Sequence, residues 1–210
     1  MNYLEVLEET RLIAILRGIK AEEVIEVAEI LVKSGIKLIE IPLNSPEPFE
    51  SIKILVKHYK NSPDILIGAG TVCNANDVEK LKEIGASLVI SPNVDVDVIK
   101  KTKELNLISI PGFLTPSEAY TAINNGANSI KLFPFKKFGI SYYNDIKVIL
   151  PKDMPIIVVG GVDESNIDSC LNDGIKYFGM ASSLYKPNMD LKLIQAKAEF
   201  FVKAIREFNA

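Results

Sequence analysis

Two charged residues lie inside short runs of the sequence that are otherwise apolar. Glu40 stands within KLIEIPL (37–43), and Lys131 stands within SIKLF (129–133). Such runs are typical of buried strands, where an unpaired charge is costly. Burial lowers the pKa of a lysine, so that its neutral amine can attack a ketone and form a Schiff base. A nearby glutamate can move the protons that forming and hydrolysing this bond require.

Two other interpretations of these residues are open. Glu40 and Lys131 can form a buried ion pair that fixes the register of the strands in a non-catalytic binding or scaffold protein. Alternatively, the protein isomerises or epimerises a sugar phosphate without a covalent lysine. Reduction with borohydride in the presence of a ketone substrate identifies a Schiff-base enzyme, because only such an enzyme is then labelled irreversibly.

A second group of residues favours phosphate binding. Gly160 and Gly161 lack a Cβ, so that backbone N–H groups can approach an anion closely. The segment 163–165 is predicted to open a helix, whose amino terminus attracts anions. Ser182 adds a hydroxyl group after the next apolar run. The sequence contains neither a P-loop nor a complete dinucleotide-binding fingerprint.

The elements that must position these residues alternate regularly along the chain. Eight apolar, β-branched runs are each followed by a segment of helical periodicity. Strands are expected at 11–17, 37–43, 64–69, 86–91, 107–111, 129–133, 155–159 and 176–180. Helices are expected at 21–34, 44–60, 76–84, 94–104, 116–125, 140–150, 165–172 and 191–208. This order predicts one α/β domain over residues 1–210, a (β/α)₈ TIM barrel with an N-terminal helical segment.

A doubly wound open sheet is the alternative fold, but eight regular repeats favour closure into a barrel. In a barrel, the chemistry lies at the carboxyl ends of the strands, and the loops after the seventh and eighth strands often hold phosphate. Arg17 ends the first expected strand, Thr71 follows the third and Pro92 follows the fourth. The fold therefore predicts that these residues share one face with the charged pair and the double glycine.

The composition argues against several other classes of function. Lys and Arg number 24 and Asp and Glu number 27 among 210 residues, so the net charge of −3 provides no surface for nucleic acid or an anionic membrane. The single His58 and the two cysteines, Cys73 and Cys170, argue against a zinc site and against Ser-His-Asp catalysis. We expect no metal and no cofactor. Two thiols in a chain of this size favour a reduced, cytoplasmic protein, and no apolar run has membrane-spanning length.

Six motifs occur together in a recognisable order between about residues 10 and 185. They are IAILRG (13–18), EIPLNSP (40–46), IGAGTV (67–72), SPN (91–93), KLFP (131–134) and VGGV (159–162). Together they resemble the small class I pyruvate aldolases, which act on 2-keto-3-deoxy-6-phospho sugar acids and on 4-hydroxy-2-oxoglutarate. The resemblance implies a homotrimeric (β/α)₈ barrel without a metal that releases pyruvate from a phosphorylated keto-deoxy sugar acid.

The resemblance also implies a role for individual residues. Lys131 is then the Schiff-base lysine, and Glu40 is the proton shuttle, acting through a water molecule. Arg17 and Thr71 are expected to help hold the anionic substrate, with Thr71 near the pyruvate carboxylate. The remaining expected contacts are Pro92 and Phe133 at the walls of the pyruvyl pocket, and Gly160, Gly161 and Ser182 around the phosphate.

Two positions refine the expected substrate. Gluconate-type members of the family carry an arginine where Asn44 stands and a threonine where Val159 stands, and the sequence resembles the galactonate-type members instead. The two substrates are epimers at C4, and a threonine hydroxyl can hydrogen-bond one epimer whereas a valine cannot. We expect cleavage of 2-dehydro-3-deoxy-6-phosphogalactonate to pyruvate and D-glyceraldehyde 3-phosphate, with the gluconate epimer and 4-hydroxy-2-oxoglutarate as alternatives. A bulky Phe135 stands where small residues are frequent and is expected to alter the mouth of the site if it points inward.

Overall fold

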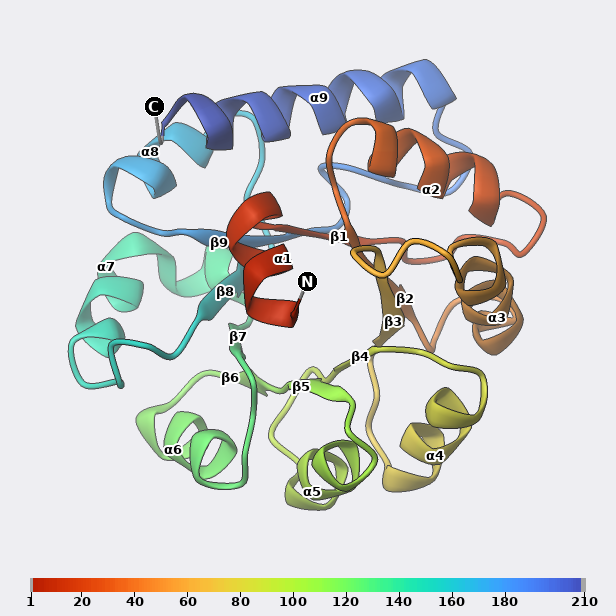
Figure 1. The fold of residues 1–210 in the computed structure, drawn as a ribbon. Helices are drawn as coiled ribbons and strands as arrows, with labels where there is room; N and C mark the ends of the chain where they lie inside the picture. The colour runs from red at the N-terminus through yellow and green to blue at the C-terminus, as the bar shows by residue number, and fades with distance from the viewer. Residues whose placement is uncertain (1, 209–210) are drawn as a thin grey trace.

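Each apolar run expected to form a strand does so, and all paired strands run parallel in a nearly closed barrel surrounded by helices (Figure 1). The computed structural model describes residues 2–208, so the ends of the expected domain, residues 1 and 209–210, lie outside the described residues. The strands are β1 (Leu12–Ile15), β2 (Leu38–Pro42), β3 (Leu66–Gly70), β4 (Leu88–Ile90), β5 (Ile108–Ile110), β6 (Gly112–Phe113), β7 (Ile130–Leu132), β8 (Ile156–Val159) and β9 (Tyr177–Met180). The predicted TIM-barrel fold is confirmed.

The fifth predicted strand is longer than expected and is interrupted once. It was expected to end at Pro111, but the chain continues through β6, so that β5 pairs with β4 and β6 pairs with β7. Pro111 has no N–H group and therefore breaks the hydrogen-bond ladder. Its carbonyl still accepts a hydrogen bond from the N–H of Lys131 at 2.9 Å, which keeps the two halves in one barrel wall.

Helices on the outside of the barrel follow the strands (Figure 1). They are α2 (Val24–Lys33), α3 (Pro48–His58), α4 (Ala75–Glu83), α5 (Val96–Glu104), α6 (Pro116–Asn124), α7 (Phe135–Lys147), α8 (Ile167–Asn172) and α9 (Leu191–Glu207). Gly139, with a φ of 72°, is not helical and divides α7 into two helical segments. The second segment begins at residue 140, as expected, whereas the short segment that starts at Phe135 was not expected. The expected helix start at residue 165 is wrong, because side-chain hydrogen bonds hold that segment as a loop ahead of α8.

Strand alternation divides the buried residues into two layers. Ile13 and Ile15 of β1 face the barrel interior, whereas Leu12 and Ala14 pack against the helices. Residues 39 and 41 of β2 and residues 130 and 132 of β7 belong to the outer layer. The same period therefore turns Glu40 and Lys131 into the interior, as the alternation predicts.

The N-terminal helix α1 (Tyr3–Thr10) closes the amino end of the barrel (Figure 1). Tyr3, Val6 and Leu7 pack into the inner layer of the barrel. The Tyr3 hydroxyl lies 2.8 Å from Ser129 Oγ, both groups are buried, and burial raises the pKa of Tyr3. The carboxyl ends of the strands are left as the open face. Among residues 2–208, no helix combines the length and apolarity needed to cross a bilayer.

Candidate active site

Glu40 is fully enclosed by the barrel, with 3% of its surface exposed. From β2 it pairs with Ile15 of β1 and with Gly68 of β3. A Cβ built on Gly70 would lie 2.7 Å from the Glu40 Oε1 atom, so the absence of a side chain at residue 70 makes room for the carboxylate. Glu40 Oε2 is buried and has no hydrogen-bond partner within the described chain. A buried polar atom without a partner marks a place for a water molecule or a ligand.

Lys131 enters the same space from β7, where it pairs with Gly112 on one side and Ile157 on the other. Its side chain is also buried, with 7% of the residue exposed. The Lys131 ammonium lies 5.4 Å from the centre of the Phe133 ring, which is itself partly open to solvent. The amine is therefore held in an apolar surrounding and borders the open face.

The two charged side chains are not in direct contact. Among residues 2–208, no hydrogen bond or ion pair joins Glu40 to Lys131. Both side chains line a small cavity of about 10 Å³, together with aliphatic residues and Gly179. This volume suits about one water molecule. The strand register is therefore not fixed by a direct ion pair between Glu40 and Lys131.

Burial controls the acid–base properties of both groups. It raises the pKa of Glu40 from the ordinary value of 4.5 to about 7, against the opposing charges of Lys131 and Arg17. It lowers the pKa of Lys131, although the charge of Glu40 acts in the opposite direction. Both shifts favour the neutral forms near neutral pH. The pair can therefore supply a nucleophilic amine and a group that gives or takes a proton.

Arg17 follows β1 at the open end of the barrel, and its side chain is exposed. Its positive charge acts on the pKa of both Glu40 and Lys131, so it lies within electrostatic range of the pair. The Arg17 guanidinium donates a hydrogen bond to Asn44 Oδ1 at 2.6 Å. Asn44, one of the two positions that refine the substrate, therefore orients the arginine.

The double glycine follows β8 in a conformation that other residues rarely adopt. Gly160 and Gly161 have φ angles of 95° and 90°. A Cβ on Gly160 would lie 3.4 Å from the Phe133 ring, and the N–H of Lys136 donates to the Gly160 carbonyl at 2.8 Å. The loop is therefore held against the start of α7 and against the aromatic ring that covers Lys131.

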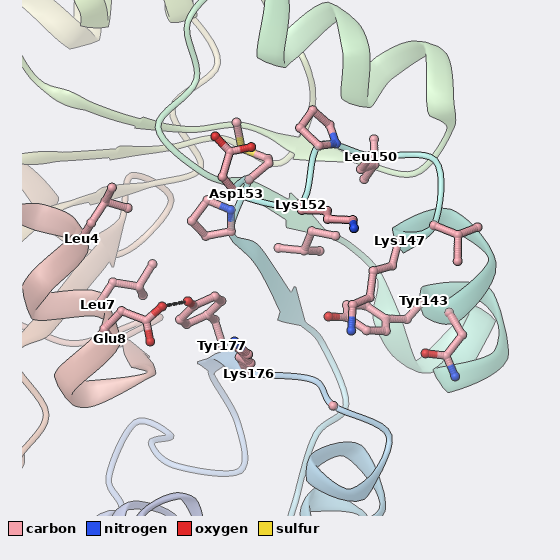
Figure 2. A pocket seen from close by; sticks show the side chains of 17 residues that line it. Leu4, Leu7, Glu8, Tyr143, Lys147, Leu150, Lys152, Asp153, Lys176 and Tyr177 are labelled. Carbon is pink, nitrogen blue, oxygen red and sulfur yellow. Dashed lines mark hydrogen bonds between the residues drawn. The ribbon is translucent and has the colours of Figure 1, made fainter. Parts of the chain in front are cut away.

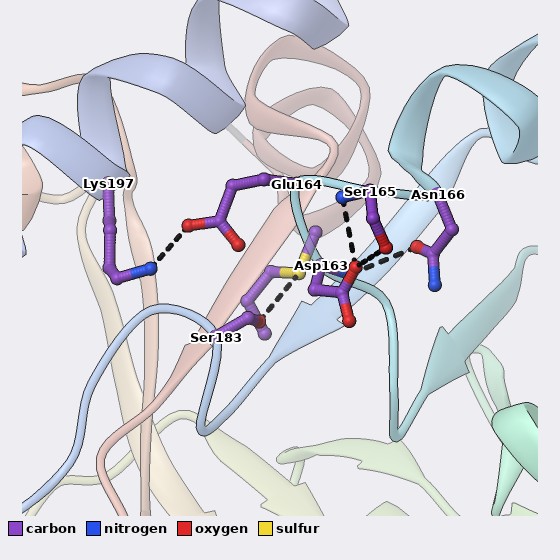
Figure 3. A network of polar contacts seen from close by, with 7 residues as sticks. Asp163, Glu164, Ser165, Asn166, Ser183 and Lys197 are labelled. Carbon is purple, nitrogen blue, oxygen red and sulfur yellow. Dashed lines mark hydrogen bonds and ion pairs between the residues drawn. The ribbon is translucent and has the colours of Figure 1, made fainter.

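The next residues form a network that holds the loop in shape (Figure 3). The Asp163 carboxylate accepts hydrogen bonds from the N–H and hydroxyl groups of Ser165. The Asn166 carboxamide accepts from the N–H of Asp163 at 3.0 Å and donates to the Gly161 carbonyl at 2.9 Å. The donors at 163 and 165, expected to attract an anion, are thus engaged within the loop.

Two backbone donors of the loop remain open. Across the described residues, the N–H groups of Gly161 and Val162 donate to no protein acceptor. Successive backbone N–H groups beside glycines form a concave anion site. The phosphate-binding potential of this loop therefore lies in the double glycine and not in the helix that follows.

Thr71, Pro92 and Ser182 follow β3, β4 and β9, so the topology brings them to the open face. Thr71 is half-buried and has a φ of 57°, and the Cys73 thiol donates to its carbonyl at 3.5 Å. Within residues 2–208, no hydrogen bond joins the side chains of these three residues to the charged pair. Their contacts with substrate stay predictions.

Sequence reasoning missed two residues of the site and left one open. Gly70 belongs to the IGAGTV motif, but the room that it leaves for the Glu40 side chain depends on a contact between two strands. The side chain of Lys136, which follows Phe135 in the sequence, lies over Gly161. Phe135 itself is 4% exposed and packs in the outer layer, so it does not point into the barrel interior.

A much larger hollow, of about 820 Å³, lies at the amino end of the barrel (Figure 2). Leu4 and Leu7 of α1 border it, together with Tyr177 at the start of β9. The Tyr177 hydroxyl donates to Glu8 at its wall. Neither member of the charged pair lines this hollow, so its size does not mark the reactive site.

A family model decides the identification. The model for KDPG and KHG aldolases matches residues 4–196, and therefore includes every candidate residue of the site. The chain belongs to this aldolase family. It is accordingly an enzyme, a lyase of the aldolase type.

Individual members of the family are similar over most of the chain. A protein of Rhizobium meliloti named probable 2-dehydro-3-deoxy-6-phosphogalactonate aldolase is 44% identical, over 90% of this chain and 89% of its own. The 2-dehydro-3-deoxy-6-phosphogalactonate aldolase of Escherichia coli is 37% identical, over 93% and 95%. A solved structure described as native KDPGal superposes with a TM-score of 0.90 at 36% identity, over 94% of this chain and 95% of that one.

Replacing Gly70 by alanine is expected to destabilise the aldolase through Glu40. The new Cβ must displace a carboxylate that would otherwise lie 2.7 Å away. Overpacking of this kind costs about 1–3 kcal/mol, measurable by urea unfolding. In a Glu40→Ala background the same change should cost much less. Equal costs in the two backgrounds would show that Gly70 does not make room for Glu40.

The buried Glu40 is also expected to make stability depend on pH. Its pKa is raised in the fold, so the native state loses stability as pH rises from 4.5 to about 7. Glu40→Gln removes that dependence and should be more stable than the wild type near pH 8, by at most about 3 kcal/mol. Urea unfolding at several pH values measures the difference, with exposed Glu50→Gln as the control. A difference that stays constant between about pH 5 and pH 8 contradicts the burial effect.

Proposed function

We propose that the protein is a class I aldolase that cleaves 2-dehydro-3-deoxy-6-phosphogalactonate to pyruvate and D-glyceraldehyde 3-phosphate. Lys131 is the Schiff-base lysine and Glu40 is the proton shuttle. The observation that carries the proposal is that a buried amine and a buried carboxylate with one unpartnered oxygen line the same small cavity. A reactive amine needs this desolvation, and a shuttle needs a water within reach.

The reaction begins when neutral Lys131 attacks the C2 ketone of the substrate. Glu40 relays protons to the departing hydroxyl group, and water leaves to give an iminium ion. The iminium withdraws electrons from C3 as the C3–C4 bond breaks and the C4 hydroxyl loses its proton. D-glyceraldehyde 3-phosphate departs. The remaining enamine takes a proton at C3, and hydrolysis of the iminium frees pyruvate and restores the Lys131 amine.

The substrate's charges are met by groups around the open face. Arg17 lies within electrostatic range of the pair and is oriented by Asn44, which supports its part in holding the carboxylate end, together with Thr71. Pro92 and Phe133 form the walls of the pyruvyl pocket. Gly160, Gly161 and Ser182 hold the phosphate group, a role supported by the open N–H donor of Gly161.

Val159 supports the choice of the galactonate epimer. It lines the same small cavity as Glu40 and Lys131, with 6% of its surface exposed. A threonine at this position would present a hydroxyl group inside the site, whereas valine presents only methyl groups. Two relatives at 44% and 37% identity carry names that specify the galactonate compound. The gluconate epimer and 4-hydroxy-2-oxoglutarate remain the alternative substrates.

The proposed assembly is a homotrimer in a reducing, cytoplasmic compartment. Large exposed apolar side chains, such as Val148 at 81% and Phe138 at 45%, are compatible with contacts between copies. A solved chain at 36% identity and a TM-score of 0.90 comes from a protein cage designed by fusing symmetric oligomeric domains; it covers 94% of this chain and 73% of that one. The cysteines Cys73 and Cys170 are both free, as in most cytosolic proteins.

Pyruvate release from the two C4-epimeric phospho sugar acids tests the proposal. The wild type should cleave the galactonate epimer at least as well as the gluconate epimer. Val159→Thr should shift the ratio of kcat/KM values toward the gluconate epimer by about tenfold, the effect of one hydrogen bond of about 1–2 kcal/mol. A decisive preference of the wild type for the gluconate epimer would refute the assigned specificity. Absence of pyruvate from both substrates would refute the proposed reaction.

A further inference from the structure

Lys136 is the second residue of α7 and lies across the double-glycine loop. A Cβ on Gly161 would come within 2.4 Å of the Lys136 Cβ, 2.6 Å of its Cδ and 2.9 Å of its Cγ. The Lys136 stem therefore occupies the space that any other residue at position 161 would need for its side chain. The N–H of Lys136 also donates to the Gly160 carbonyl at 2.8 Å, which fixes the start of the helix to the loop.

The charges around this loop single out Lys136. Asp163 and Glu164 bring two carboxylates close to the site proposed for a dianionic phosphate group. Lys197, the neighbouring cation in Figure 3, is already paired with Glu164. Within the described part of the chain, the Lys136 ammonium forms no ion pair, although its side chain is exposed. Its positive charge therefore lies near the loop without being held in an ion pair.

The electrostatic neighbourhood agrees with this placement. Hydrogen bonds from Ser165 hold the pKa of the Asp163 carboxyl below its ordinary value, and the charge of Lys136 lowers it further. The charge of Lys136 therefore acts on groups at the carboxyl end of β8. The chain as a whole carries a net charge of −3, so an anionic group at this loop depends on a local cation.

We infer that Lys136 is a specificity-determining residue that binds the phosphate group of the substrate together with the N–H groups of Gly161 and Val162. This inference rests on the proposed function for the location of the phosphate group. It adds a charged contact that the double glycine and Ser182 do not supply. The aldolase thereby discriminates phosphorylated sugar acids from their unphosphorylated analogues, because only the former can neutralise this ammonium.

Lys136→Met tests the inference, because methionine keeps an unbranched stem over Gly161 and removes the charge. Lys137→Met, the next exposed lysine of α7, is the matched control. Lys136→Met should raise the KM for the phosphorylated substrate about tenfold or more with little change in kcat, the result of losing one charged contact. The borohydride-trapped adduct with pyruvate, which has no phosphate group, should form at the wild-type rate. Lys137→Met should match the wild type in both assays.

A KM for Lys136→Met within about twofold of the wild type, or equal losses in the two lysine variants, would overturn the inference. A second readout does not depend on turnover. Inorganic phosphate, compared with chloride at equal ionic strength, should raise the Tm of the wild type and of Lys137→Met but not that of Lys136→Met. If the enzyme cleaves no phospho sugar acid but shows this pattern of Tm shifts, the proposed function fails and the phosphate contact stands. If all three proteins shift alike, the phosphate contact is refuted.

Discussion

Burial of two ionisable groups inside an apolar barrel is the constraint on which the rest of the structure depends. Glu40 and Lys131 line the same cavity of about 10 Å³ without direct contact. Had they been in contact, mutual attraction would have stabilised both charges and kept the amine protonated. Separation leaves desolvation as the largest influence on each pKa, raising that of the carboxyl group and lowering that of the amine. Burial of the two separated groups therefore lowers the stability of the fold and makes the amine and the carboxyl group more reactive.

The scaffold supports this arrangement with unusual residues at a few positions. Gly70 leaves the volume that the Glu40 carboxylate occupies, and α1 closes the amino end of the barrel. Phe133 covers the Lys131 amine and packs against Gly160, so that the amine and the double-glycine loop are in contact with one ring. A substrate that spans both regions therefore meets groups whose relative positions are set by packing before it binds.

Periodicity predicted the barrel and the inward direction of Glu40 and Lys131, because a residue's side of a strand depends only on local alternation. It placed the end of the fifth strand too early. The barrel wall continues past Pro111, because the Pro111 carbonyl still accepts a hydrogen bond from the N–H of Lys131. It also assigned anion donors to 163–165 that side chains of the same loop occupy. The space at Gly70 and the position of Lys136 depend on contacts between distant segments. No local pattern contains that information.

The most direct test of the central claim is chemical trapping of the amine. The protein is incubated with pyruvate and borohydride, and the modified peptide is identified by mass spectrometry. The account predicts one irreversible adduct on Lys131, no such adduct in Lys131→Ala, and loss of turnover in that variant. An adduct on another lysine, or wild-type levels of labelling in Lys131→Ala, would contradict the assignment of the buried amine as the nucleophile.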